Sequence, residues 1–234
     1  MKLALIASLA ALVYPLVLRL GVDVSVVFVL VSLVVPILGV VAIARVDTPR
    51  RARAIAHLVV AAPPLFSLLG GWLDFQHAVP VHSLTVWIPL WIALAIAVAV
   101  ERAPAGLAAT RAASQATRPS RLAIAHGISA AIVTLFALPH LVNHLAGLAG
   151  GDVHIAVMDT LRRGYRHPLV EPVLLAAVAF QIITGAWLLG RVSARSPSWQ
   201  RAVQTAGGAY LLVFFLSHVS AALRARARGG ASPR

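Results

Sequence analysis

The chain is organised around the stretch RLAIAHGISAAIVTLFALPHLVNHLAGLAG, residues 121–150. It is long enough to cross a bilayer as one helix, because a span needs about 20 apolar residues. His126 lies near its start, and His140 and His144 lie near its end. A helix places His126 and His140 on nearly the same face, about 21 Å apart along its axis. It therefore offers imidazoles at two depths, and such side chains inside a membrane usually face a cavity, a partner or a cofactor.

Composition indicates an integral membrane protein. Of the 234 residues, 60% are hydrophobic and only 12% are charged, which is about half the charged fraction of a soluble domain. The net charge of +13 comes from arginines that cluster between apolar runs, with Lys2 the only lysine. This distribution is typical of orientation in a membrane and argues against a nucleic-acid partner. Cysteine is absent, which excludes disulfides and cysteine-ligated iron–sulfur clusters.

The apolar runs predict an all-α polytopic membrane helix bundle with about seven transmembrane helices. The predicted spans are 3–18, 24–44, 54–71, 84–100, 122–148, 170–190 and 203–223. Prolines inside spans are tolerated when neighbouring groups satisfy the carbonyls that they free. We expect the first two spans to pack outside the others, because they carry no histidine and few polar residues.

An internal repeat links the third and fifth spans. Arg53-Ala-Ile-Ala-His57 recurs as Leu122-Ala-Ile-Ala-His126. Alanine-rich membrane helices also produce such similarity by composition alone. With the repeat, the chain divides into a transmembrane hairpin at 1–48, a first repeat at 49–120 and a three-helix unit at 121–234.

Basic residues favour a cytoplasmic N-terminus. With seven spans, 12 of the lysines and arginines lie on the side of the N-terminus and 8 on the other, and positive charge is retained in the cytoplasm. The tail conflicts with this bias, because Arg224, Arg226, Arg228 and Arg234 would lie outside. We expect a protein of a bacterial cytoplasmic membrane, in contact with lipid.

The predicted helix directions sort four histidines into two pairs. His57 and His126 lie near one surface, and His140 and His218 lie toward the other. A b-type haem takes two axial imidazoles from different helices at one level. Small residues such as Gly127 leave room for a flat ring, although they also suit close helix packing. The pattern predicts one or two haems with these four histidines as iron ligands.

From Arg121 onward the chain resembles the membrane-anchor cytochrome b subunit of the succinate dehydrogenase and fumarate reductase superfamily. The matching residues are Arg121-Leu122, Gly127, His140-Leu-Val-Asn143, 153–159, Tyr165-Arg166, Trp199, Gln204, Thr205, Gly207, Phe215, Leu216 and His218. The resemblance implies that His140 and His218 ligate haem and that flavoprotein and iron–sulfur subunits are partners. It departs at Gln181, where the family has a ligand histidine.

Several neighbours of these histidines are also candidates. His144 follows His140 by one helical turn, so only one of the two can be the axial ligand of a given iron. We expect His140 to ligate and His144 to contact a quinone or a propionate. The segment 152–168 predicts an interfacial amphipathic helix, whose Tyr165 and Arg166 hold propionates or a quinone carbonyl, or meet lipid headgroups. Tryptophans near span ends fit interfacial anchoring; they are Trp72, Trp87, Trp91, Trp187 and Trp199.

Two functions of different classes follow. In the first, the chain is a membrane b-type cytochrome with haem b and quinone, the electron-transfer subunit of a quinone-linked oxidoreductase. In the second, it is a non-catalytic membrane adapter or assembly protein that retains a cytochrome b-like fold. The chain is also similar to a fungal mitochondrial membrane adapter family. An absorption spectrum of the purified protein separates the two.

Overall fold

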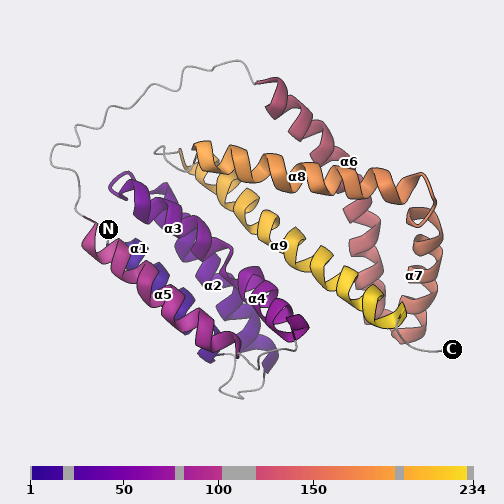
Figure 1. Ribbon diagram of the computed structural model, residues 1–234, viewed down its shortest axis with the longest axis horizontal. Helices are drawn as coiled ribbons and strands as arrows, with labels where there is room; N and C mark the ends of the chain where they lie inside the picture. Colours follow the sequence, from indigo (N-terminus) through magenta and orange to yellow (C-terminus); the bar gives the residue numbers. More distant parts are fainter. Residues whose placement is uncertain (1, 18–23, 77–81, 102–119, 193–197, 231–234) are drawn as a thin grey trace. The chain divides into compact units, whose positions relative to one another are not determined.

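The computed structural model describes residues 2–17, 24–76, 82–101, 120–192 and 198–230. Of these residues 92% are helical, and no strand occurs among them (Figure 1). The chain divides into two compact units. The first comprises Met1–Arg111 and Leu189–Arg234, and the second comprises Ala112–Leu188.

Ten helical segments make up the described residues. In the first unit they are α1 (Lys2–Val17), α2 (Val24–Ala44), α3 (Arg50–Val60), α4 (Ala62–Gln76), α5 (Ser83–Val100) and α9 (Trp199–Gly230). In the second they are α6 (Arg121–Ala146), the 3-10 helix η1 (Gly147–Ala149), α7 (Gly151–Tyr165) and α8 (Val170–Val192), whose last residues belong to the first unit.

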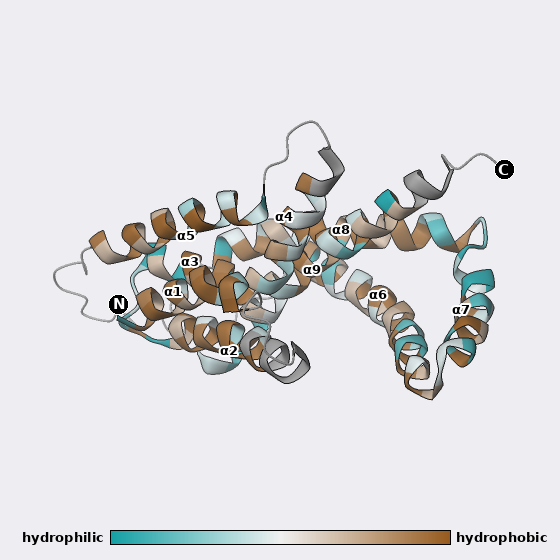
Figure 2. Cartoon of the chain, turned by 90° about the horizontal axis from the view of Figure 1, so that it is seen from below, coloured by the Kyte–Doolittle hydropathy of each residue, from teal (hydrophilic) through white to brown (hydrophobic). Residues whose placement is uncertain are grey.

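Several helices are long and apolar enough to cross a membrane. In the described part of the chain these are four: α5, α6 with η1, α8, and Trp199–Ala225 of α9. The pair α3 and α4 is a fifth if the two helices form one span, and α1 and Ser32–Ala44 of α2 are shorter apolar helices. Figure 2 shows the hydrophobic residues along these helices, and α7 mixes hydrophilic and hydrophobic residues. The count of seven spans and the internal repeat stay predictions.

The third predicted span, 54–71, is not one continuous helix. α3 and α4 are bent by 66° at a break beside Ala61. Pro63 and Pro64 lack the N–H groups that a straight helix would direct at the carbonyls four residues earlier. The first backbone N–H after the two prolines is that of Leu65, and it donates to the Ala61 carbonyl at 2.9 Å. The break agrees with the expected effect of prolines inside a span, and whether α3 and α4 cross as one span stays a prediction.

The first two helices belong to the core of the first unit. Ala4, Ala7, Ser8 and Ala11 form a buried stripe on α1 with helical spacing. Small side chains let neighbouring helices approach closely, as they do in membrane proteins generally. Small residues mark the buried face of α1, and its other face exposes Ile6, Leu9 and Val13. The expectation that the first two spans pack outside the others stays a prediction.

A cluster of aromatic rings fills the space beside this stripe. Trp87 and Trp91 of α5 are fully buried, with ring centroids 5.4 Å apart. Phe66 of α4 lies edge-on to both Trp87 and Tyr14, at centroid distances of 5.1 and 6.3 Å. Edge-to-face contacts of this kind add stabilisation beyond the buried area. Interfacial anchoring therefore does not describe Trp87 and Trp91.

The end of α2 is closed by a buried arginine. Arg53 is 4% exposed. Its Nε donates to the Ile43 carbonyl at 3.3 Å, and its Nη2 donates to the carbonyls of Arg45 and Thr48 at 3.1 and 2.8 Å. Carbonyls at a helix C-terminus have no partner inside the helix and favour a nearby cation. Arg53 therefore joins α3 to the end of α2.

The start of α3 is closed by a carboxylate from the end of α5. Glu101 accepts hydrogen bonds from the backbone N–H groups of Arg51 and Ala52, at 3.0 and 2.8 Å. N–H groups in the first turn lack partners within the helix, and a negative charge there is favourable. Glu101 thereby fixes the end of α5 to α3 across 50 residues of sequence.

In the second unit α6 and α7 form an antiparallel hairpin. The turn contains Gly150 at φ 122°, a conformation that only glycine adopts readily. Next to the turn, His154 donates from Nδ1 to the Asn143 carbonyl at 2.9 Å. Farther along, Tyr165 meets the edge of Phe136 with ring centroids 5.5 Å apart. α7 therefore folds back along the second half of α6.

Candidate functional site

The four predicted iron ligands are distributed over both units. His57 on α3 and His218 on α9 belong to the first unit, whereas His126 and His140 on α6 belong to the second. Each predicted haem pair thus combines residues of different units. The pairing of His57 with His126, and that of His140 with His218, stay predictions.

His57 is held by its own helix. The ring is buried, and Nδ1 lies 2.8 Å from the Arg53 carbonyl. A carbonyl only accepts, so Nδ1 carries the proton and Nε2 carries the lone pair of the neutral ring. Nε2 lies 3.3 Å from Thr205 Oγ1, whose single proton goes either to Nε2 or to the Arg201 carbonyl at 2.9 Å. The Nε2 contact is the longer of the two that His57 makes.

His126 is held by a threonine of α8. Its Nδ1 lies 2.7 Å from Thr184 Oγ1, and this hydroxyl lies 2.6 Å from the Phe180 carbonyl. Because the hydroxyl proton goes to the carbonyl, Thr184 accepts from His126 Nδ1. No hydrogen-bond partner of His126 Nε2 occurs among residues the structure describes. His126 therefore has the same tautomer as His57, with its lone pair on Nε2.

Two further residues of α8 shape the surroundings of His126. Gln181 donates from Nε2 to the His126 carbonyl at 2.6 Å. A Cβ at Gly185 would lie 3.6 Å from His126 Cε1, so α8 passes within contact distance of the ring. The resemblance leads us to expect a ligand histidine at position 181. Gln181 stands there instead, and its side-chain amide binds a backbone carbonyl of α6.

Sequence reasoning did not find Thr184. The signal was present, because Gln181 and Thr184 are polar residues three positions apart in an apolar helix, and such residues share a face. Which neighbouring helix that face meets depends on packing between segments more than 50 residues apart. The spacing of polar residues along α8 does not say which helix that face meets.

His140 and His144 touch one another near the end of α6. Their Nε2 atoms are 3.3 Å apart, and the rings are perpendicular with centroids 4.8 Å apart. His140 stacks on Phe136 at a centroid distance of 5.8 Å. His154 of α7 lies near His144, with ring centroids 6.0 Å apart. The hairpin therefore gathers three imidazoles at its closed end.

The three imidazoles do not form a three-ligand metal site as they stand. Within the described ranges, no three His, Asp or Glu side chains are arranged so that they could hold a metal ion together. The same end of the hairpin buries Asn143, which is 5% exposed and whose Oδ1 has no partner in the described part of the chain. Any ion here would be held by two imidazoles as they stand.

His218 lies in a row of aromatic rings on α9. It stacks on Phe214 at a centroid distance of 5.6 Å, and Phe214 stacks on Tyr210 at 6.4 Å. A Cβ at Gly207 or Gly208 would have no atom within 4 Å. Both glycines are exposed on α9, and a channel beside His218 stays a prediction.

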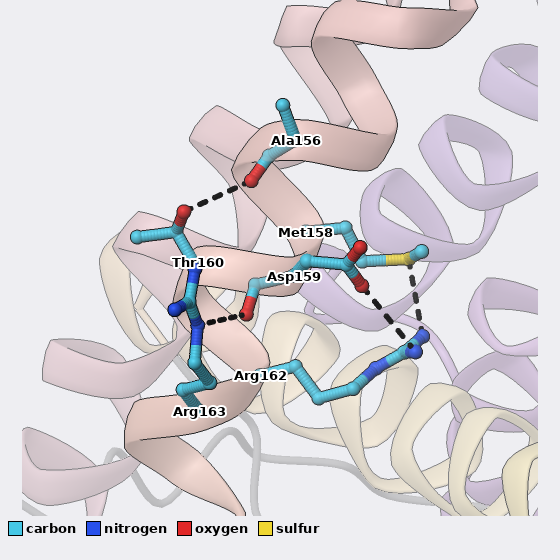
Figure 3. Close-up of polar contacts among 6 residues, drawn as sticks. All are labelled: Ala156, Met158, Asp159, Thr160, Arg162 and Arg163. Atoms are coloured by element: carbon cyan, nitrogen blue, oxygen red, sulfur yellow. Dashed lines mark hydrogen bonds and ion pairs between the residues drawn. The ribbon is translucent and has the colours of Figure 1, made fainter.

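The predicted polar residues of α7 have different environments (Figure 3). Arg162 lies 3.6 Å from Asp159 Oδ1 and donates to Met158 Sδ at 3.4 Å, and Arg163 donates to the Asp159 carbonyl at 3.4 Å. Both arginines therefore contact their own helix. Tyr165 packs on Phe136, whereas Arg166 is exposed at the end of α7. Of the two predicted residues, Arg166 has the charge and the exposure to meet an anionic group.

Comparison with protein-family models, with curated proteins and with solved structures finds no match for this chain. The class that fold and composition define is an all-helical protein with several helices long and apolar enough to span a membrane. The resemblance to cytochrome b anchor subunits stays a prediction.

Proposed function

We propose that the chain is a membrane b-type cytochrome that carries electrons between a quinone and a separate redox protein. The observation that supports this most is shared by His57 and His126. In each, Nδ1 donates to a protein oxygen, at 2.8 and 2.7 Å, so that Nε2 keeps the lone pair. Metal-ligating histidines are commonly oriented in this way, with the second nitrogen donating to a carbonyl or another oxygen.

The residues beside His126 suit a flat macrocycle. Gly127 follows it, and a Cβ there would have no atom within 4 Å. The helix is apolar and of membrane length, so its lipid-facing side excludes water from the ring. A bound haem would supply reversible one-electron chemistry of its iron. The chain's own part is to orient the imidazoles through Arg53 and Thr184 and to keep the site dry.

The remaining candidates have supporting roles in this proposal. His140 and His218 are proposed as ligands of a second haem, which requires His140 Nε2 to leave His144. Arg166 and Tyr165 lie at the end of α7, where an exposed guanidinium suits a propionate or a quinone carbonyl. Flavoprotein and iron–sulfur subunits are proposed as partners on the resemblance to cytochrome b anchor subunits, and the chain itself has no cysteine to hold a cluster.

The test is an optical spectrum of tag-free protein purified from haem-replete cells. We expect a sharp α-band of the b type in the reduced-minus-oxidised spectrum. His126→Ala should lower the haem content, and His167→Ala is the matched control because His167 is exposed and its Nδ1 accepts from the Leu169 N–H. Colourless wild-type protein would refute the proposal and favour the membrane adapter. Equal haem loss in both variants would remove the assignment of His126.

A further inference from the structure

The contact between His140 and His144 has the dimensions of a chelating pair. Two imidazole nitrogens that each lie roughly 2.0–2.1 Å from a tetrahedral ion are about 3.3 Å apart. The two Nε2 atoms are separated by 3.3 Å and share a hydrogen bond, so one of them carries a proton, and an ion that displaces this proton meets both lone pairs at the spacing of a chelate. The rings of such a pair have centroids about 5 Å apart, and these lie 4.8 Å apart.

The pair is positioned by the helix itself. Residues four apart lie on one face of an α-helix, and two histidines with this spacing are a recurring metal chelate. Phe136 stacks on His140 at an interplanar angle of 18°, which restricts rotation of that ring. The two nitrogens therefore face one another without a rearrangement of the backbone.

A third imidazole, that of His154, lies close to the pair and carries its proton on Nδ1. His154 donates from Nδ1 to the Asn143 carbonyl at 2.9 Å, so its Nε2 carries the lone pair. Its ring centroid lies 6.0 Å from that of His144, about 1 Å more than two ligands of one ion require. His154 therefore lies next to the pair without belonging to it, and no three-ligand group occurs among the described residues.

From this geometry we infer that His140 and His144 bind a divalent transition-metal ion as a pair, with water at the remaining coordination positions. Imidazole nitrogens suit Zn²⁺, Ni²⁺ and Cu²⁺, whereas Mg²⁺ and Ca²⁺ prefer oxygen ligands. This inference does not rest on the proposed haem. The metal ion would compete with the proposed second haem for His140, because a single Nε2 atom cannot bind both a haem iron and this ion.

The experiment is a calorimetric titration of the full chain in detergent micelles, without a polyhistidine tag and after treatment with a chelator. We expect one Zn²⁺ per chain, tighter binding of Cu²⁺ in the order that nitrogen ligands impose, and no binding of Mg²⁺. His144→Ala should weaken Zn²⁺ binding by at least about tenfold, since even outer partners of a ligand contribute that much. Electron paramagnetic resonance of the Cu²⁺ form should show nitrogen ligation that weakens in the same variant.

The matched control is again His167→Ala, which removes an exposed imidazole of the same unit and should leave the Zn²⁺ affinity unchanged. His154→Ala should give a smaller loss than His144→Ala, because His154 lies beside the pair without belonging to it. The inference is overturned if wild type binds no Zn²⁺, or if His144→Ala and His167→Ala bind it equally. Haem content is measured in the same samples, so that a protein with zinc but no haem refutes only the cytochrome, and one with haem but no zinc refutes only the chelate.

Discussion

Trp87 donates a hydrogen bond from Nε1 to the Ala11 carbonyl at 3.0 Å, across the buried contact of α5 and α1. In a regular helix this carbonyl would accept from the N–H of the residue four positions later, but that residue is Pro15, which has no N–H. The indole therefore replaces the hydrogen bond that Pro15 removes. A neighbouring helix thus satisfies a freed carbonyl inside an apolar bundle.

Replacement of Trp87 by Phe should consequently lower the free energy of unfolding by about 1–3 kcal/mol, the cost of a buried carbonyl without a partner. In a Pro15→Ala background the loss should be smaller, because the substituted alanine supplies the missing backbone N–H. Thermal unfolding in detergent measures both. Trp91→Phe is the control, since Trp91 Nε1 is buried without a partner in the described residues. Equal losses at Trp87 in both backgrounds would show that only volume matters.

Arg53→Ala should destabilise the chain by about 2 kcal/mol or more, because it removes a donor from three carbonyls near the end of α2, of which that of Arg45 keeps the Thr48 N–H at 3.3 Å. The neighbouring variant Arg51→Ala removes an exposed guanidinium and should change stability by less than about 0.5 kcal/mol. Chemical denaturation in mixed micelles compares the two. Similar losses in both would mean that Arg53 acts only through the net charge.

Gly39→Ala should cost about 1–3 kcal/mol through overpacking. A Cβ at this position would lie 2.6 Å from Val60 Cγ2 and 2.9 Å from the Ala56 carbonyl, so the backbones of α2 and α3 would have to separate. Gly207→Ala meets open space and should be neutral or slightly stabilising. A melting temperature of Gly39→Ala equal to that of wild type would contradict the close approach of these helices.

Thr184→Val should disturb His126 without changing the side-chain volume, because Val cannot accept the hydrogen bond from Nδ1. If His126 ligates haem, we expect an affinity loss of about 10–100-fold and a higher midpoint potential, since the ligand becomes less basic. Thr184→Ser keeps the hydroxyl and should behave like wild type. Redox titration measures the midpoint potentials of wild type and of the two variants. An unchanged potential in Thr184→Val would argue against ligation by His126.

Hydropathy was enough to place the long helices. The predicted spans 84–100 and 170–190 agree closely with α5 and α8, because membrane-length apolar runs have few alternatives to a helix. The packing partners of each helix were harder to predict from the sequence. Lipid tails are as apolar as leucine, so no hydrophobic driving force selects one helix face for contact with another helix. The burial of Trp87 and the roles of Thr184 and Arg53 all depend on such choices.

If the other predicted spans all cross the membrane, the bend at Ala61 determines the parity of the crossings. With α3 and α4 as one span, the chain would then end on the side opposite to Lys2; with a re-entrant loop, it would end on the same side. Either parity leaves 12 lysines and arginines on the side of Lys2 and 8 on the other, so charge bias is equal in the two cases. Because the chain has no cysteine, Val46→Cys and His82→Cys can each be labelled alone with an impermeant reagent. Labelling from the same side would bring the arginine-rich tail to the side of Lys2.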